Sequence, residues 1–210
     1  MEATASSPAA TAPKRRREVL DRLSAAVERL LAAGESYTNL SVARLVKEAG
    51  LARSTFYVYF EDKADLLSAL TEEAVHELVE TTRFWWDLPP EADRDDLRAA
   101  LRRTYEAFVP HKGVMASVVE VASYDPEVSK RYDTLVARSI DQAAAHIEEG
   151  IRDGFVAPDL DPRRTAAWIC WMIERGLSYI GRPGNEAELE QWLDGLTGLV
   201  WNTLYREVHA

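Results

Sequence analysis

Residues 53–59 carry the side chains whose chemistry is clearest in this sequence. One long cation and four hydroxyl groups fall within seven positions, at Arg53, Ser54, Thr55, Tyr57 and Tyr59. A guanidinium can pair bidentately with guanine, and the methyl group of a threonine can meet that of a thymine. Short hydroxyls and the longer tyrosine hydroxyls suit phosphate oxygens. The pattern predicts a surface that reads DNA, although Arg53 can be a solvated cation and each tyrosine a half-buried packing residue.

Two short helices around a glycine turn are predicted to position these side chains. Ser41 can cap a first helix, in which apolar residues recur at 3–4 spacing at Val42, Leu45 and Val46. Gly50 follows where a helix end needs a left-handed residue, and Phe56 and Phe60 would anchor the second helix from below. Such a pair is a helix-turn-helix, whose second helix enters the DNA major groove.

More cations and hydroxyls flank this motif. Residues 1–13 are rich in Ala, Ser, Thr and Pro and are predicted to be disordered. They are followed by Lys14, Arg15, Arg16 and Arg17. Four cations at a helix N-terminus oppose its dipole, which favours a basic arm on phosphates or in the minor groove over a solvated helix start. Thr38 and Ser41 can add hydroxyl contacts to the DNA backbone.

The charge distribution fits this interpretation. The net charge is −10, yet residues 1–63 contain 10 Lys and Arg against 8 Asp and Glu, whereas the other 147 residues contain 15 against 27. A mildly basic head on an acidic body is expected when only the head approaches DNA. The single cysteine fits a reducing cytoplasm, and the longest apolar run, Ala166–Ile173, is too short to span a membrane. We therefore expect a cytoplasmic protein outside the membrane.

Helical periodicity extends along nearly the whole chain. Helices are predicted at about 15–33, around the turn, at 63–86, and at about 93–109, 114–123, 126–150, 162–180 and 187–208. No sustained alternation predicts a strand. The expected fold is all-α, with a three-helix DNA-binding domain at residues 14–63 and a helical C-terminal domain at 64–210.

Catalysis and metal binding have no support in the sequence. No two of the four histidines, His76, His111, His146 and His209, are three or four residues apart, so the paired-histidine spacing of a helical metal site is missing. Cys170 lies in the most apolar segment and is expected to be an inert thiol. We expect no catalytic residue, metal site or cofactor.

Leu40 to Leu67 resembles the DNA-binding domain of the TetR family of one-component regulators. The resemblance rests on Gly50, Thr55-Phe56-Tyr57, Phe60, Lys63 and Leu66-Leu67. Pro110–Lys112 (PHK) and Met172–Arg175 (MIER) resemble the branch that contains the mycobacterial repressor of ethionamide activation. The resemblance implies a repressor on a palindromic double-stranded operator, released by a small apolar effector, with Lys63 clamping the DNA backbone. An activator, or a regulator that answers to a protein partner, stays an open alternative.

The resemblance also assigns roles in the C-terminal domain. It implies an effector pocket walled by Tyr105, Phe108, Tyr132, Trp168, Trp171, Met172, Glu174 and Trp201. A plain packed core is the alternative, in which Glu174 pairs with Arg175. Ser139 and Gln142 replace pocket aromatics of that branch, so the ligand can differ. The last two helices are expected to pair across a two-fold axis into a homodimer through Trp192, Leu196, Leu199 and Thr203, unless they only complete a monomer core. Effector binding would then pivot the helix at 63–86.

Overall fold

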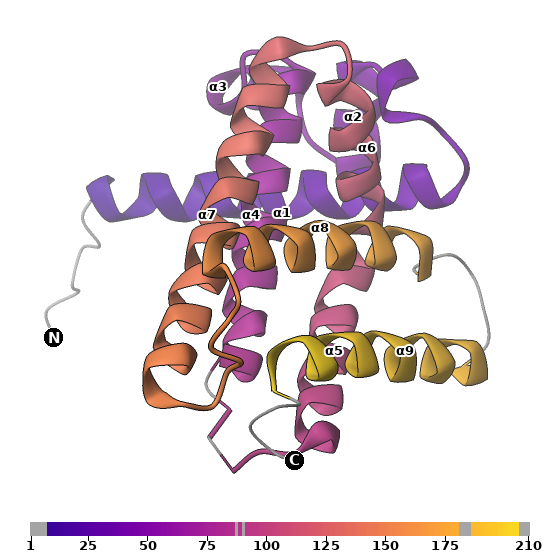
Figure 1. The fold of residues 1–210 in the computed structure, drawn as a ribbon. Helices are drawn as coiled ribbons and strands as arrows, with labels where there is room; N and C mark the ends of the chain where they lie inside the picture. Colours follow the sequence, from indigo (N-terminus) through magenta and orange to yellow (C-terminus); the bar gives the residue numbers. More distant parts are fainter. Residues whose placement is uncertain (1–7, 87, 90, 181–185, 206–210) are drawn as a thin grey trace, which may run out of the picture. The chain divides into compact units, whose positions relative to one another are not determined.

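The structure, a computed structural model, describes residues 8–86, 88–89, 91–180 and 186–205 (Figure 1). The elements are α1 (Pro8–Ala32), η1 (Tyr37–Asn39), α2 (Val42–Ala49), α3 (Arg53–Tyr59), α4 (Lys63–Trp86), α5 (Arg94–Phe108), η2 (Val109–His111), α6 (Lys112–Ala122), α7 (Pro126–Asp153), α8 (Pro162–Ile180) and α9 (Glu186–Leu204). No strand occurs within these ranges, and the all-α prediction is confirmed. None of the described helices is long and apolar enough to cross a membrane.

The start of α1 differs from the prediction. The helix begins at Pro8 rather than near Arg15, so it includes residues 8–13, while residues 1–7 lie outside the described part. The alanines at positions 9, 10 and 12 are the best helix formers, and this preference outweighs the polar character of the segment. At the other end, α9 stops at Leu204, and residues 206–208 of the predicted helix are not described.

The helices form two compact units. The first contains Met1–Glu73 and Gly113–Ser129, and the second contains Ala74–Lys112 and Lys130–Ala210. This division differs from the expected boundary after residue 63. The continuous helix α4 contributes to both units, and α6 returns to the N-terminal one.

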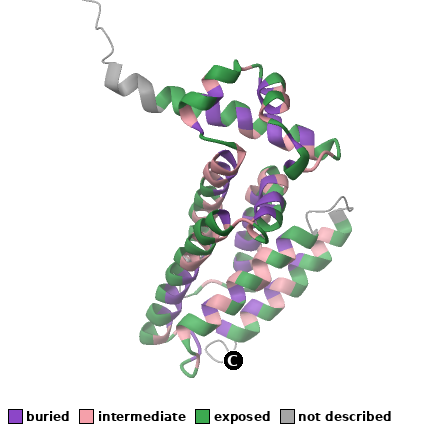
Figure 2. Cartoon of the chain, turned by 90° about the horizontal axis from the view of Figure 1, so that it is seen from above, coloured by how far each residue is buried: buried purple, intermediate pink, exposed green. Residues whose placement is uncertain are grey.

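The first unit has its core where α1, α2, α3 and the start of α4 meet. α1 packs against α2, and α2 against α3. Large apolar side chains are fully enclosed between them, at Leu23, Leu45, Phe56, Leu66 and Leu67. Figure 2 shows the buried positions recurring along the helices, as an inward-facing stripe requires.

A close contact with α1 explains why α6 belongs to the first unit. The Oε1 atom of Glu28 accepts the backbone N–H of Val114 at 2.9 Å. A Cβ atom at Gly113 would lie 2.6 Å from Oε2 of Glu28 and 2.8 Å from Cδ1 of Leu31. A larger residue at position 113 would therefore require the ends of the Glu28 and Leu31 side chains to shift.

The second unit is built around α5, α7, α8 and α9. Asp93 and Asp96 form a capping box at the start of α5. α5 packs against α9, which also packs against α8. Arg98 links α5 to α9 through Asp194, at 2.6 Å, and through Glu190. The enclosed residues include Trp85, whose Nε1 donates to the hydroxyl of Tyr205 at 2.9 Å.

Candidate nucleic-acid interface and effector pocket

A helix-turn-helix is formed by α2, the turn at Gly50 and α3. The side chain of Ser41 caps α2 by accepting the backbone N–H of Arg44 at 3.2 Å. Gly50 ends α2 in the left-handed conformation, with φ 63° and ψ 36°, and the N–H of Leu51 returns to the carbonyl of Val46 at 2.8 Å. These local features agree with the sequence prediction, and they aim α3 away from α2.

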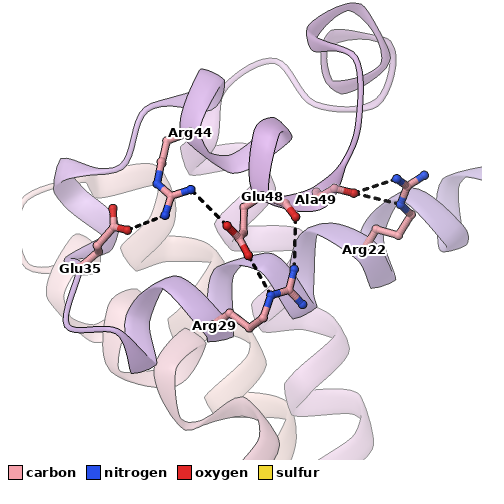
Figure 3. Close-up of polar contacts among 6 residues, drawn as sticks. All are labelled: Arg22, Arg29, Glu35, Arg44, Glu48 and Ala49. Atoms are coloured by element: carbon pink, nitrogen blue, oxygen red, sulfur yellow. Dashed lines mark hydrogen bonds and ion pairs between the residues drawn. The ribbon is translucent and has the colours of Figure 1, made fainter.

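Arg22 of α1 holds this turn (Figure 3). Its Nε and Nη2 atoms donate to the carbonyl oxygen of Ala49 at 3.1 and 2.8 Å, and Nη2 also donates to that of Gly50 at 2.6 Å. The last carbonyls of a helix lack partners within it, so the guanidinium satisfies them and ties α2 to α1. Sequence periodicity gives no sign of this contact, because the acceptors are backbone atoms far along the chain.

An ion-pair network continues this interface from the end of α2 toward its start (Figure 3). The carboxylate of Glu48 accepts Nε of Arg29 at 3.0 Å and Nη1 of Arg44 at 3.1 Å, and Nη2 of Arg44 reaches Glu35 at 3.0 Å. Hydrogen bonds from Arg29 and then Arg44 lower the pKa of Glu48. None of these residues was a predicted site residue, although opposite charges on two packed helices are a signal that could have found them.

The recognition helix α3 has one outward and one inward face. Phe56 is fully enclosed, whereas Arg53, Ser54 and Tyr57 are exposed together. The guanidinium of Arg53 lies over the ring of Tyr57, 5.6 Å from its centroid, and Nη2 donates to the tyrosine hydroxyl at 3.3 Å. The other predicted contacts on this helix, Thr55 and Tyr59, are half-buried at its edges. Val58 is also exposed and was not predicted as a site residue.

Lys63 does not have the phosphate-clamping position that the resemblance implied. Its ammonium donates to the carbonyls of Tyr37, at 3.2 Å, of Thr38, and of Leu40, at 3.0 Å. An ammonium has three N–H donors, and all three are used here to cap η1. Partial burial also lowers the pKa of Lys63. The residue therefore fixes the loop between α1 and α2.

Thr38 is likewise engaged inside the first unit. Its hydroxyl donates to Oε1 of Glu120 at 2.8 Å and lies 3.1 Å from the hydroxyl of Tyr124, both near the end of α6. A neighbouring carboxylate repels a phosphate, so the predicted DNA contact is not supported at this position. Ser41 uses its oxygen as a cap, which leaves its O–H available to donate.

The basic run is part of a helix, not an extended arm. Lys14, Arg15, Arg16 and Arg17 are all exposed on α1. Because α1 begins at Pro8, the four cations do not sit at its N-terminus, and the dipole argument for an arm does not apply. Arg17 is paired with Glu73 at 2.5 Å and Asp21 at 3.4 Å, and the guanidinium of Arg16 lies 5.7 Å from the ring centroid of Phe60.

The second unit contains an apolar hollow of about 200 Å³ between α5, α8 and α9. We call it the α5–α9 hollow. It is lined by Leu101, Thr104, Tyr105, Met172, Ile173, Gly176, Leu177, Trp192, Leu193, Gly195, Leu196 and Leu199. No charged side chain of the described residues lines it. A Cβ atom at Gly176 or Gly195 would meet no atom within 4 Å, so neither glycine is required for close packing within the chain.

Only Tyr105 and Met172 of the predicted pocket residues line this hollow. Trp168 and Trp171 are exposed, with exposed fractions of 70% and 46%, and stack edge to face on the surface of α8. The other predicted aromatics lie elsewhere: Phe108 is enclosed in the core, and Trp201 borders a separate hollow of about 20 Å³, room for one water. Helical spacing alone could not show which face of α8 turns inward.

Glu174 is bonded to Tyr132, whose hydroxyl donates to its carboxylate. Burial, and then Glu174, raise the pKa of Tyr132. The predicted pocket residues Tyr132 and Glu174 therefore satisfy each other instead of facing the hollow. Burial, and then Glu174, also raise the pKa of Cys170 to about 11, which keeps the thiol protonated at neutral pH. The described residues contain no group of His, Cys, Asp and Glu that could hold a metal ion.

The outer face of α8 and α9 exposes large apolar side chains. These are Trp168, Trp171, Tyr179, Trp192 and Leu199, and we call them the α8–α9 face. Tyr179 and Trp192 stack across the two helices, with ring centroids 5.6 Å apart. The predicted dimer residues Trp192, Leu199 and Thr203 are exposed on α9, and Leu196 is half-buried.

Comparisons with known proteins match both units. Residues 23–70 match the family described as bacterial regulatory proteins, tetR family, and residues 92–196 match the tetracyclin repressor-like C-terminal domain. The chain belongs to the TetR family of DNA-binding transcriptional regulators.

Two relatives illustrate the similarity. The HTH-type transcriptional regulator EthR of Mycobacterium tuberculosis is 27% identical over 172 residues, covering 80% of this chain and 79% of that protein. The fatty acid metabolism regulator protein of Bacillus subtilis is 24% identical over 163 residues, which cover 77% of this chain and 82% of that protein. Among solved structures, the fatty acid degradation regulator FadR of Bacillus halodurans has a TM-score of 0.69 at 19% identity, covering 86% and 95% of the two chains.

Proposed function

We propose that this regulator is a homodimeric repressor that binds a palindromic operator in the cytoplasm and is released by a small, uncharged, apolar effector. Family membership supports operator binding. The observation that carries the effector is the α5–α9 hollow, an unfilled apolar space beside two glycines. Glycine inside a helix costs about 1 kcal/mol relative to alanine, and packing within the chain gives no reason for that cost at Gly176 or Gly195.

The exposed face of α3 supports a contact with the major groove. Arg53 would pair with guanine, and Ser54 and Tyr57 would reach base edges or phosphates beside it. The cations Lys14, Arg15 and Arg16 supply charge for phosphates. A single head reads only one half-site, so a two-fold dimer is needed to read a palindrome.

The α8–α9 face supports the dimer. Soluble monomers rarely leave large contiguous apolar patches exposed, and aromatic side chains are enriched where proteins associate. We propose that Trp168 and Trp171, first expected in the pocket, belong to this dimer surface together with Trp192 and Leu199. A two-fold axis would bring the same four side chains from each protomer together.

The size and lining of the hollow restrict the effector. A dry cavity of about 150 Å³ binds benzene, and drug-sized ligands occupy about 300–1,000 Å³. A hollow of about 200 Å³ therefore suits one substituted ring or a short alkyl chain. A solved structure of FadR from Bacillus subtilis, 20% identical to this chain, contains stearoyl-CoA. Within the part of the chain that the structure describes, no charged residue lines the hollow to meet the phosphates of such a ligand.

Effector binding and dimer geometry would be coupled, because Trp192, Leu196 and Leu199 border the hollow and also lie on or beside the dimer surface. Filling the hollow would shift these side chains, and by thermodynamic reciprocity the dimer would alter effector affinity. A changed dimer moves the two recognition helices out of the spacing that successive major grooves require.

The test starts with selection of an operator from random duplex DNA by the purified protein. Operator affinity is then measured with substituted benzenes and short-chain alcohols. We expect at least one compound to raise the melting temperature and to release the operator from the wild type. Gly176→Leu, which fills the hollow, should abolish both effects, whereas the control Gly176→Ala should keep them. If no compound of either class binds, or if Gly176→Leu responds like the wild type, the effector proposal is wrong.

A further inference from the structure

Val58 is exposed on α3 together with Arg53, Ser54 and Tyr57. Its exposed fraction is 71%, the largest of any large hydrophobic residue in the described ranges. Ser54 and Val58 each lie two positions from the enclosed Phe56, about 200° around the helix. Both therefore point away from the core, and the exposed Arg53 and Tyr57 flank them on α3.

An exposed valine has a cost at this position. A β-branched side chain loses rotamer freedom in a helix, and α3 has only seven residues. The side chain gains no packing within the unit that offsets this loss. Its neighbours are a guanidinium and hydroxyls, which favour water over an apolar group. These observations point to an apolar partner outside the chain.

We infer that Val58 contacts the C5-methyl group of a thymine in each operator half-site. This inference rests on the proposed insertion of α3 into the major groove. The thymine methyl is the apolar group among the base edges presented there, and the other edges present hydrogen-bond donors and acceptors. Val58 has neither, so facing another base edge would desolvate polar atoms without replacing their hydrogen bonds. Val58 therefore favours thymine through apolar contact with its methyl group, and it disfavours the other bases because it cannot replace the hydrogen bonds of their edges.

The test replaces thymine by uracil, which removes only the C5-methyl group. In the operator selected by the full-length protein, each thymine is changed to uracil in turn, symmetrically in both half-sites. Affinity is measured for the wild type, for Val58→Ala, and for the control Val119→Ala, which shortens an exposed valine on α6. Affinity for random DNA reports whether the Val58→Ala head is still folded.

We expect one thymine per half-site at which uracil weakens wild-type binding about fourfold per half-site, the worth of one buried methyl group. Val58→Ala should lose this preference and keep its affinity for random DNA, whereas Val119→Ala should behave like the wild type. Equal sensitivity of wild type and Val58→Ala at every thymine would overturn the inference and leave operator binding intact. Failure to select any sequence would instead overturn operator recognition, and this inference with it.

Discussion

At the level of single residues, arginines of α1 determine how the helix-turn-helix is held. Arg22 satisfies the carbonyls of Ala49 and Gly50, where α2 ends and the turn to α3 begins. The angle between α2 and α3 depends on this turn. The contact is therefore expected to affect operator recognition more than the overall fold.

Replacement of Arg22 by glutamine tests this role. Loss of a charged hydrogen bond at a largely exposed position should cost about 1 kcal/mol in stability, while affinity for the selected operator should fall more than affinity for random DNA. The control Arg83→Gln removes an exposed arginine from the second unit and should change neither. Filter binding measures the ratio of the affinity for the operator to the affinity for random DNA. An equal loss of affinity for both DNAs would contradict a positioning role.

Glu48 is expected to make this head sensitive to acid. Arg29, and then Arg44, lower its pKa, so its stabilising contribution is complete above the unfolded pKa of about 4.3. That contribution is lost as the pH falls through the lower folded value. Glu48→Gln should melt at a lower temperature than the wild type at pH 7, and this difference should shrink at pH 3. Circular dichroism melting curves measure it, and an equal difference at both pH values would contradict the assignment.

Single-residue roles were the hardest part to predict from sequence. The roles of Ser41 and Gly50 in capping the two ends of α2 were predicted correctly, because capping depends on neighbours within a few residues. Lys63 and Thr38 were assigned to DNA, yet their partners are Leu40 carbonyl and Glu120 carboxylate groups 23 and 82 residues away. A donor-rich side chain looks the same in sequence whether its acceptor is a phosphate or the chain's own backbone.

At the level of elements, periodicity was sufficient to place the helices. The apolar stripes predicted α4 and α8 with the same ends that the structure has. Periodicity could not show which unit a helix joins. α6 belongs to the first unit because Glu28 caps it and Gly113 admits close contact with α1, and such a fit depends on three-dimensional shape.

The basic run on α1 gives a prediction for an element. Lys14, Arg15 and Arg16 are exposed, whereas Arg17 is already paired with Glu73. Changing the first three to glutamine should reduce the slope of log affinity against log salt by up to about 3, since each lost phosphate contact removes about 0.9. Arg17→Gln should reduce it less. A titration from low to high salt measures both slopes, and an unchanged slope in the triple variant would mean that this turn of α1 does not touch DNA.

At the level of the whole molecule, the proposed function requires the second unit to supply both a partner surface and a space for a ligand. The sequence predicted an aromatic pocket, but a packed helix can send its rings to either side. In α8, Trp168 and Trp171 face outward and Met172 faces the hollow. The sequence therefore predicted that α8 carries more apolar side chains than one buried face needs, but not which of them line the hollow and which lie on the surface.

The dimer is tested by a charge on the α8–α9 face. Leu199 has an exposed fraction of 58%, so glutamate there is tolerated by an isolated protomer. In a dimer it would be buried opposite its own copy, which costs several kcal/mol for each unpaired carboxylate. We expect Leu199→Glu to sediment as a folded monomer and to lose operator affinity. The control Phe84→Glu places the same charge at a side chain with an exposed fraction of 52%, on α4, and should remain dimeric. A dimeric Leu199→Glu with normal operator affinity would place the interface elsewhere on the molecule.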